Sequence, residues 1–264
     1  MSKKLTTMIL AAGKGKRMKN PDKSKVMYEL NGKPMVQYVI ELAQKINSDL
    51  IIPVVGHQKE SVMNFIRDTF SNEIAKIKFA HQDEQLGTGH AVMQAENILK
   101  DFQGDVLILS GDVPMLRYET VEAFVNFHYE NNFDASLISA ILDDPSGYGR
   151  VLRDGSGNLY DIREEKDCSD AEKKCKEMNS GIYVIDKEIL FEALKTLKTD
   201  NAQGEYYLTD VFRFFKSAGK KIGAFPVTNI IEITGINTVE QLEELEKTAS
   251  ETYCCKCLLK FFYN

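Results

Sequence analysis

The chain has 264 residues, of which 43% are hydrophobic and 27% charged, with a formal net charge of −6. These values are typical of a folded globular protein and exclude collagen-like, mucin-like and disordered chains. The acidic balance argues against nucleic-acid binding, and the apolar runs are far shorter than the ~20 residues of a membrane span. Since the N-terminus also lacks an apolar stretch long enough for a secretory signal, the sequence predicts a cytoplasmic protein without nucleic-acid or membrane partners.

The first half of the chain alternates strands with helices. Short apolar runs predict strands at 5–12, 50–55, 77–80 and 105–109, and helical spacing predicts helices at 34–46, 58–70, 88–100 and 118–131. Thr88 is expected to cap the start of the third helix. This alternation favours an α/β fold with a mostly parallel sheet, in which ligands bind beyond the carboxyl ends of the strands.

The second half of the chain is more mixed. It predicts strands at 134–142, 150–153, 158–163, 181–186 and 222–227, and helices at 187–198, 205–218 and 238–250. We expect 1–230 to form one compact domain with a small mixed β extension. Residues 231–264 are expected to form a C-terminal helical arm and tail.

A glycine turn follows the first predicted strand, and it carries most of the local positive charge. Residues 14–25 contain six basic residues and a single acidic one. The basic residues are Lys14, Lys16, Arg17, Lys19, Lys23 and Lys25. Met18 stands where a dinucleotide fingerprint needs a third glycine, and the spacing of a P-loop is absent. The remaining interpretations are a solvated basic loop or a turn whose backbone N–H groups and cations bind a small polyanion.

Two further polar residues lie at predicted element boundaries. Asp112 closes the strand at 105–109, where a carboxylate could help to hold Mg²⁺ together with substrate phosphates, or could instead cap the next helix. Asn237 precedes the last predicted helix, where Asn237 or Thr238 would serve as a cap. No serine, cysteine or histidine motif of acid–base catalysis is present, which fits phosphoryl or nucleotidyl transfer, because a phosphate dianion needs no general base.

Seven blocks together resemble the sugar-1-phosphate nucleotidyltransferases, and most closely their N-acetylglucosamine-1-phosphate uridylyltransferase domains. In order they are LAAGKGKRM (10–18), LNGKPMVQYVI (30–40), EQLGTGHAV (84–92), SGDVP (110–114), PSGYGRV (145–151), EMNSGIY (177–183) and NAQGEYYLTD (201–210). The resemblance runs from about residue 5 to about residue 245. It implies a doubly wound, Rossmann-like nucleotidyltransferase fold.

The resemblance also implies a role for individual residues. Arg17 and Lys25 would neutralise the triphosphate, and Asp112 and Asn237 would hold Mg²⁺. N-acetylglucosamine 1-phosphate would contact Gly149, Glu164 and Asn179, with the 201–210 block completing that wall. The residues expected to bind the nucleotide are Leu10, Ala11, Ala12, Gly13, Gln82, Gly87, Thr88, Ser110 and Gly111.

The implied reaction is attack of the sugar phosphate on the α-phosphorus of UTP. One departure from the family pattern is Ser24, which stands where a proline normally precedes the lysine. The period of hexapeptide repeats that forms a left-handed β-helix in related chains is also absent, so we expect neither a β-helix nor a trimer built on it. Two alternatives remain, namely another nucleotide or sugar phosphate, and an inactive nucleotide-binding regulatory module.

Overall fold

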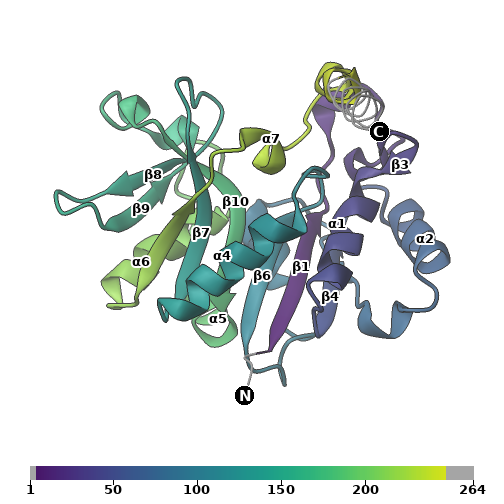
Figure 1. Cartoon of the computed structure of the whole chain (residues 1–264), viewed down its shortest axis with the longest axis horizontal. Helices are drawn as coiled ribbons and strands as arrows, with labels where there is room; N and C mark the ends of the chain where they lie inside the picture. Colours follow the sequence, from purple (N-terminus) through teal and green to yellow (C-terminus); the bar gives the residue numbers. More distant parts are fainter. Residues whose placement is uncertain (1–3, 248–264) are drawn as a thin grey trace, which may run out of the picture.

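The computed structural model describes residues 4–247, which form one mixed sheet covered by helices on both faces (Figure 1). The spatial order of the main strands is β11-β7-β10-β6-β1-β4-β5. Their bounds are β1 (Leu5–Ala11), β4 (Leu50–Val55), β5 (Ala80–His81), β6 (Asp105–Ser110), β7 (Ala135–Ile141), β10 (Glu177–Asp186) and β11 (Ile222–Pro226). Among these seven strands only β10 runs antiparallel to its neighbours, β6 and β7, so this part of the sheet is mostly parallel, as predicted.

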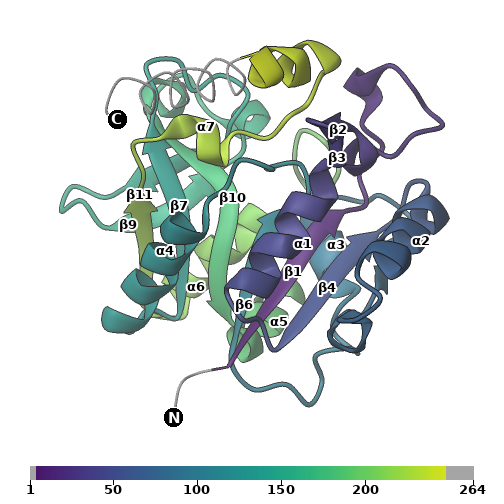
Figure 2. The ribbon, with the colours of Figure 1, turned by 45° about the vertical axis from the view of Figure 1, so that its right-hand side comes forward.

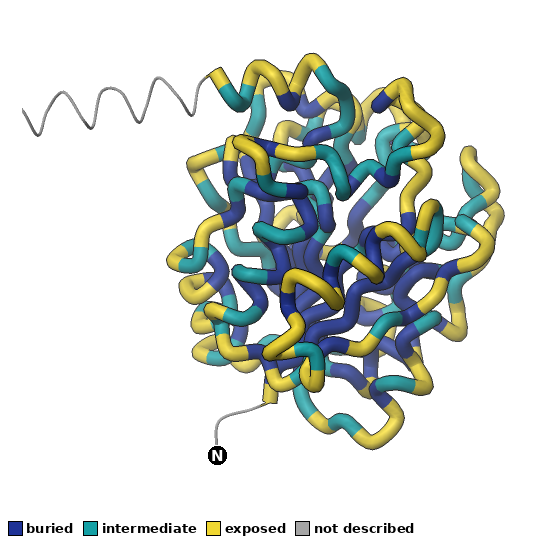
Figure 3. The backbone as a smooth tube through the Cα atoms, turned by 90° about the vertical axis from the view of Figure 1, so that its right-hand side faces the viewer, coloured by how far each residue is buried: buried dark blue, intermediate teal, exposed yellow. Residues whose placement is uncertain are grey.

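Two helix layers bury the two faces of this sheet because the central strands are apolar on both sides. One core joins β1 residues such as Ile9 to α1 (Met35–Lys45), α2 (Lys59–Thr69) and α4 (Tyr118–Glu130). The other joins Met8 of the same strand to α3 (Thr88–Met93), α5 (Lys187–Leu194) and α6 (Val211–Ser217). Figure 3 shows this buried centre in dark blue under partly exposed helices. The fold is therefore the doubly wound α/β arrangement that the family resemblance implies.

Pro53 lies inside β4 without interrupting the sheet. The carbonyl groups of Ile51 and Val55 accept hydrogen bonds from Lys78 and Gln82 on the β5 side. Since alternate residues of a strand face the same neighbour, Pro53 directs its missing N–H to that side as well. There β5 is only two residues long, which makes this edge the place where a proline does least damage.

The mixed extension consists of β8 (Arg150–Arg153) and β9 (Leu159–Arg163), which form an antiparallel pair beside β10. A separate hairpin of β2 (Glu29–Leu30) and β3 (Lys33–Pro34) was not predicted. Its turn, Asn31-Gly32, has positive φ at both residues. Asn-Gly is the usual signal for a two-residue hairpin turn, so the sequence contained the information.

Three predicted helices are shorter in the structure. The helix predicted at 88–100 ends at Met93, and the chain continues in i→i−3 turns that keep the apolar spacing but not the α-helix. The helix predicted at 205–218 begins only at Val211, after a 3₁₀ turn, because Tyr206 pairs with Leu86 and Gly89 through its backbone. The helix predicted at 187–198 ends at Leu194.

The chain returns over the carboxyl edge of the sheet after β11. The short helix α7 (Ile230–Ile233) was not predicted, and residues 239–247 are helical, within the predicted 238–250. Figure 2 shows this yellow segment beside the purple loop that follows β1. Ile236 and Leu242 pack on Leu30 and Met35 in a small third core. The boundary at residue 230 stays a prediction, and the tail from residue 248 lies outside the described residues.

Candidate active site

The site lies where the order of the sheet reverses. β1 has β4 on one side and β6 on the other, so the chain leaves the carboxyl ends of β1 and β6 on diverging paths. In open α/β sheets this switch point is the usual ligand crevice. A cavity of about 450 Å³ opens there, lined by residues that follow β1, residues 82–91 and the end of β6.

The glycine turn brings the backbone close to Lys25. Gly15 has φ of +58°, and a Cβ at this position would lie 2.7 Å from the Cβ of Lys25. Only glycine accepts both the left-handed conformation and this close approach without strain. The turn therefore delivers its backbone N–H groups and the following Arg17 to the same end of the cavity as Lys25.

Four of the predicted residues meet in one polar cluster, although they come from distant parts of the chain. The Lys25 ammonium group pairs with the Asp112 carboxylate and donates to Asn237 Oδ1 at 2.7 Å. Arg17 Nη2 donates to the same Asn237 oxygen at 2.9 Å. The side chains of Lys25 and Asp112 are only 14% and 19% exposed, so little water screens their attraction.

Local capping leaves both oxygen-bearing residues free for this cluster. The cap of α4 is Arg117, so Asp112 does not cap that helix. At the next helix, Thr238 Oγ1 accepts from Gln241 N, and Gln241 Oε1 accepts from the backbone of Asn237 and Thr238. This capping box satisfies the helix start, and the Asn237 side chain is left to face the cations.

The segment 82–89 forms the other wall of the cavity. Gln82 is 3% exposed, and its amide nitrogen donates to Gly87 O at 3.0 Å. Gly87, with φ of +110°, is the N-cap of α3, and a Cβ there would lie 2.6 Å from Tyr206 O. Thr88 was expected to cap this helix, but its Oγ1 accepts instead from Leu208 N at 3.1 Å. The hydroxyl is thus used to join this wall to the segment 205–208.

The three residues predicted to bind the sugar also meet one another. The backbone of Asn179 donates to Gly149 O at 2.8 Å, and a Cβ on Gly149 would lie 3.6 Å from Asn179 Cβ and 3.7 Å from Glu164 Oε2. Asn179 Nδ2 donates to the hydroxyl of Tyr183 at 2.7 Å. These three residues do not line the 450 Å³ cavity, but Glu205 does, and the chain then runs to Thr209 beside Glu164.

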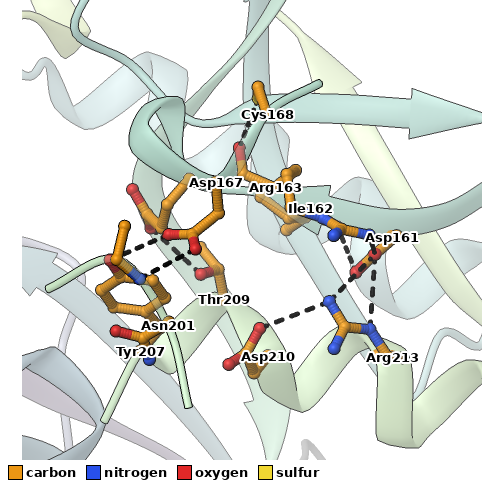
Figure 4. A network of polar contacts seen from close by, with 12 residues as sticks. Asp161, Ile162, Arg163, Asp167, Cys168, Asn201, Tyr207, Thr209, Asp210 and Arg213 are labelled. Carbon is orange, nitrogen blue, oxygen red and sulfur yellow. Dashed lines mark hydrogen bonds and ion pairs between the residues drawn. The ribbon is translucent and has the colours of Figure 1, made fainter. Parts of the chain in front are cut away.

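Acidic groups gather on this side. Burial raises the pKa of the Glu164 carboxyl above its ordinary value, and a hydrogen bond from Thr209 Oγ1, at 3.0 Å, opposes part of that rise. Burial also raises the pKa of Tyr207 to about 12, and its hydroxyl donates to Asp167 at 3.0 Å. Figure 4 shows Tyr207 beside Asp167, and Arg213 between Asp161 and Asp210.

Most of the residues predicted to bind the nucleotide line the cavity. They are Leu10, Ala11, Ala12, Gly13, Gln82, Gly87, Thr88 and Ser110, together with Lys25 and Asp112. Gly111 donates its N–H to Leu10 O at 2.9 Å, beside the cavity wall. Asn237 is connected to the cavity by its hydrogen bond with Lys25, and Arg17 in turn donates to Asn237. The functional roles of these residues stay predictions.

The cavity has further lining residues that were not predicted as site residues, namely Lys14, Gly15, Lys16, Val26, Gln85 and Ala91. The basic cluster was a signal for Lys14 and Lys16, and Gln85 belongs to the same block as Gly87 and Thr88. Val26 and Ala91 are apolar residues with no local signal, because their place depends on how the strands bring the turns together.

Comparison with known proteins agrees with this geometry. The family model described as nucleotidyl transferase matches residues 6–230. The chain is 48% identical over 243 residues to the bifunctional protein GlmU of Caldanaerobacter subterraneus subsp. tengcongensis, and 45% identical over 239 residues to that of Clostridium botulinum. These alignments cover 92% and 90% of this chain but 51% and 50% of the relatives. The chain thus spans about half the length of the curated relatives it matches.

Solved structures resemble the fold at much lower sequence identity. A UDP-glucose pyrophosphorylase complexed with UDP-glucose has a TM-score of 0.77 at 18% identity, covering 94% of this chain and 99% of that chain. An apo UDP-glucose pyrophosphorylase has a TM-score of 0.76, also at 18% identity, covering 95% and 99%. At this identity the likeness concerns the fold alone. Among residues 4–247, no helix is long and apolar enough to cross a bilayer.

Proposed function

The chain belongs to the nucleotidyl transferase family, and from this premise we propose that it transfers the uridylyl group of UTP to N-acetylglucosamine 1-phosphate and releases pyrophosphate. The observation that carries the proposal is the meeting of Arg17, Lys25, Asp112 and Asn237 beside the cavity at the switch point. A cytoplasmic location and the absence of a β-helix trimer stay predictions.

The reaction that we propose needs two anions in one place. An oxygen of the sugar phosphate attacks the α-phosphorus of UTP in line with the bond to the β-phosphate, and that bond breaks as pyrophosphate leaves. The attacking phosphate is mostly a dianion at neutral pH and needs no base. Lys25 and Arg17 offset the repulsion between the anions. Orientation of bound reactants of this kind can supply roughly 7–11 kcal/mol of the barrier.

The residues present fit a magnesium ion. One carboxylate oxygen of Asp112 and the Asn237 Oδ1 already converge on a cation, the Lys25 ammonium, and both are the oxygen ligands that Mg²⁺ prefers. Within residues 4–247 no group of three or more His, Cys, Asp or Glu side chains could hold a metal. Asp112 and Asn237 would therefore hold Mg²⁺ together with substrate phosphates. Bound there, the ion would stabilise the charge that develops on the phosphates.

The test is an assay of pyrophosphate release with purified protein. UTP, CTP and dTTP are each combined with N-acetylglucosamine 1-phosphate and with other sugar 1-phosphates, with and without Mg²⁺. We expect UTP with N-acetylglucosamine 1-phosphate to be the best pair and the rate to vanish without a divalent cation. A different best pair would reassign the substrate, and no release with any pair would favour the inactive binding module.

Two variants test the residues that carry the proposal. Lys25→Ala and Asp112→Ala are each expected to lower kcat at least ~10²-fold with the fold intact, because preorganised charge acts mainly on the transition state. Lys23→Ala is the matched control, since it removes a cation from the same loop but does not touch Asp112 or Asn237. A rate near that of the wild type in either site variant would contradict the assigned roles.

A further inference from the structure

Asn237 reaches the polar cluster of the active site at the end of a long crossing segment. After β11 ends at Pro226, residues 227–237 run over the carboxyl edge of the sheet to the loop that follows β1 (Figure 2). The helical part of this segment is α7, which has only four residues. A helix this short is not stable by itself, so contacts with the rest of the protein have to fix the position of Asn237.

The Glu232 carboxylate fastens α7 to the start of α4. Its side chain is 4% exposed, and its Oε1 pairs with Arg117 Nη2 at 2.6 Å and accepts from Asn229 Nδ2 at 2.7 Å. Its Oε2 accepts from the hydroxyl of Thr120. Arg117 caps α4 and Thr120 lies in its first turn, where the helix dipole also favours a carboxylate. Each oxygen of Glu232 therefore bonds to α4.

The two stretches that Glu232 joins also meet at their far ends, which carry Asp112 and Asn237. The backbone N–H of Ile236 donates to Asp112 O at 2.9 Å. Gly235 passes so close that a Cβ there would lie 3.3 Å from both carboxylate oxygens of Asp112. Because the stretches are joined at both ends, the contacts of Glu232 help to set the separation of the two side chains that would hold Mg²⁺.

Glu232 itself lies outside the cavity of the active site. It lines a different cavity, of about 310 Å³, between α4 and the end of β11. The 450 Å³ cavity is lined by other residues. Glu232 therefore acts on the site through the segment that it holds, and not by contact with a ligand.

We propose that Glu232 is a positioning residue of the magnesium site, which holds Asn237 at the separation from Asp112 that lets both oxygens bind one ion. Mg²⁺ demands a near-ideal octahedral geometry with short bonds, whereas Ca²⁺ accepts more flexible coordination. A displaced Asn237 should therefore cost affinity for Mg²⁺ more than affinity for Ca²⁺. The inference rests on the proposed function and adds the group that sets the geometry of its metal ligands.

The experiment measures how much a metal ion strengthens UTP binding, and it needs no turnover. Calorimetric titration without the sugar phosphate gives the Kd of UTP in Mg²⁺, Ca²⁺ or EDTA. The ratio of the Kd in EDTA to the Kd with metal is the gain due to that metal. Glu232→Ala removes the carboxylate, and Glu232→Gln keeps its size and an acceptor oxygen.

Glu177→Ala is the matched control. The Glu177 carboxylate also pairs with an arginine and accepts from a hydroxyl, those of Arg153 and Ser139, at 2.6 and 2.7 Å. It joins β10 to β8 and β7 and does not touch the crossing segment. Loss of a comparable set of bonds away from Asn237 should leave the gain due to Mg²⁺ within about twofold of the wild type.

We expect the gain due to Mg²⁺ to fall about tenfold in Glu232→Ala, the usual effect of removing a group that orients a metal ligand. The gain due to Ca²⁺ should fall less than about threefold, and the Kd in EDTA should stay within about twofold. Glu232→Gln should keep most of the gain, because its exposed arginine partner makes the lost charge worth little. In an Asn237→Ala background, Glu232→Ala should have no further effect, because Glu232 acts through Asn237.

Other results would overturn the inference. They are an unchanged gain in Glu232→Ala, an equal fall in Glu177→Ala, equal falls for Mg²⁺ and Ca²⁺, or a wild-type protein in which Mg²⁺ does not strengthen UTP binding. If circular dichroism shows that Glu232→Ala does not fold, Thr120→Val removes one donor to Glu232 and should lower the gain about threefold. A wild-type protein that binds UTP with Mg²⁺ but transfers no uridylyl group would contradict the proposed function alone.

Discussion

The two sides of the candidate site differ in charge and in how the fold builds them. The nucleotide side, formed by the cavity lining, is cationic through Lys14, Lys16 and Lys25, and it includes the turns that follow the parallel strands β1 and β6. The sugar side, around Gly149, Glu164 and Asn179, is acidic, because Glu164 lies near Asp210, Asp167 and Glu205. Cations suit phosphates and carboxylates suit hydroxyl groups, so each side matches the part of the substrates proposed for it.

The two sides also differ in how much of their bonding is already satisfied. On the nucleotide side, the glycine turn and Gln82 line the cavity, and among residues 4–247 Gln82 Oε1 has no hydrogen-bond donor. On the sugar side, Asn179 bonds to Tyr183 and Gly181, and Glu164 accepts from Thr209. The polar groups named on the sugar side are thus already hydrogen-bonded within the protein, whereas the nucleotide side offers polar groups to a ligand.

The largest predicted effect concerns the segments that connect the two sides. The segments 86–89 and 206–208 are joined by backbone bonds, and Gly87 passes so close to Tyr206 O that a Cβ would lie 2.6 Å away. At φ of +110°, Gly87→Ala adds backbone strain to this clash. We expect it to lower the free energy of unfolding by about 2–3 kcal/mol, measured by urea denaturation.

The same variant should raise KM for both substrates, because both walls depend on this junction. Gly155→Ala is the matched control, since a Cβ there meets nothing within 4 Å and no positive φ is required. A Gly87→Ala protein with the stability of the wild type, or with only one KM changed, would show that the two sides are not held together at this point.

Two turns of the nucleotide side could be placed from the sequence because each directly follows a predicted strand. LAAGKGKRM and SGDVP each follow a strand, and parallel strands end at the same edge of a sheet. Position at that edge then follows from the order of the elements alone. The strands and the two-sided core were predictable for the same reason, since buried strands are short apolar runs.

What the sequence could not give depends on contacts between distant segments. The helix predicted at 205–218 loses its first turn because Tyr206 pairs with Leu86 and Gly89. Whether Asn237 caps a helix or faces Lys25 is likewise undecided locally, since both asparagine and threonine are good caps. The choice is made by Gln241, which completes a capping box with Thr238 and leaves Asn237 for the cluster. The sugar residues met as the resemblance implied, but their internal hydrogen bonds had no local signal.

A variant on the sugar side separates it from the nucleotide side. Asn179→Ala removes an amide that is expected to bind the sugar, so KM for the sugar phosphate should rise about tenfold, the effect of losing one buried hydrogen bond or slightly more. KM for UTP should change less than about twofold, because Asn179 does not line the cavity of the nucleotide side. Steady-state kinetics with each substrate varied in turn measures both values.

Ser180→Ala controls for the loss of a hydrogen bond in the same strand, since Ser180 Oγ donates to Ile138 O at 2.7 Å. It should leave KM for the sugar phosphate near that of the wild type. Equal increases in both KM values for Asn179→Ala would mean that the two sides act as one, against the comparison drawn above.

The smallest effect concerns stability and the charge of Glu164. Burial raises the pKa of this carboxyl in the folded state, so the folded protein holds its proton more tightly than the unfolded chain does. Stability from this group is therefore lost as the pH rises above the ordinary value of 4.5 toward the raised one. Glu164→Gln removes the buried charge and should raise Tm by about 2 °C at pH 7. At pH 4, where the carboxyl is largely protonated, the gain should disappear.

Glu172→Gln gives the opposite sign and serves as the control. Hydrogen bonds from the backbone and hydroxyl of Ser169 lower the pKa of Glu172, so its ionised form stabilises the fold and its removal should lower Tm at pH 7. A fall in Tm for Glu164→Gln would mean that the ionised carboxylate serves the fold. A rise in Tm together with a higher KM for the sugar phosphate would mean that the Glu164 carboxylate destabilises the fold but binds the substrate. A buried charge of this kind would distinguish the sugar side from the nucleotide side.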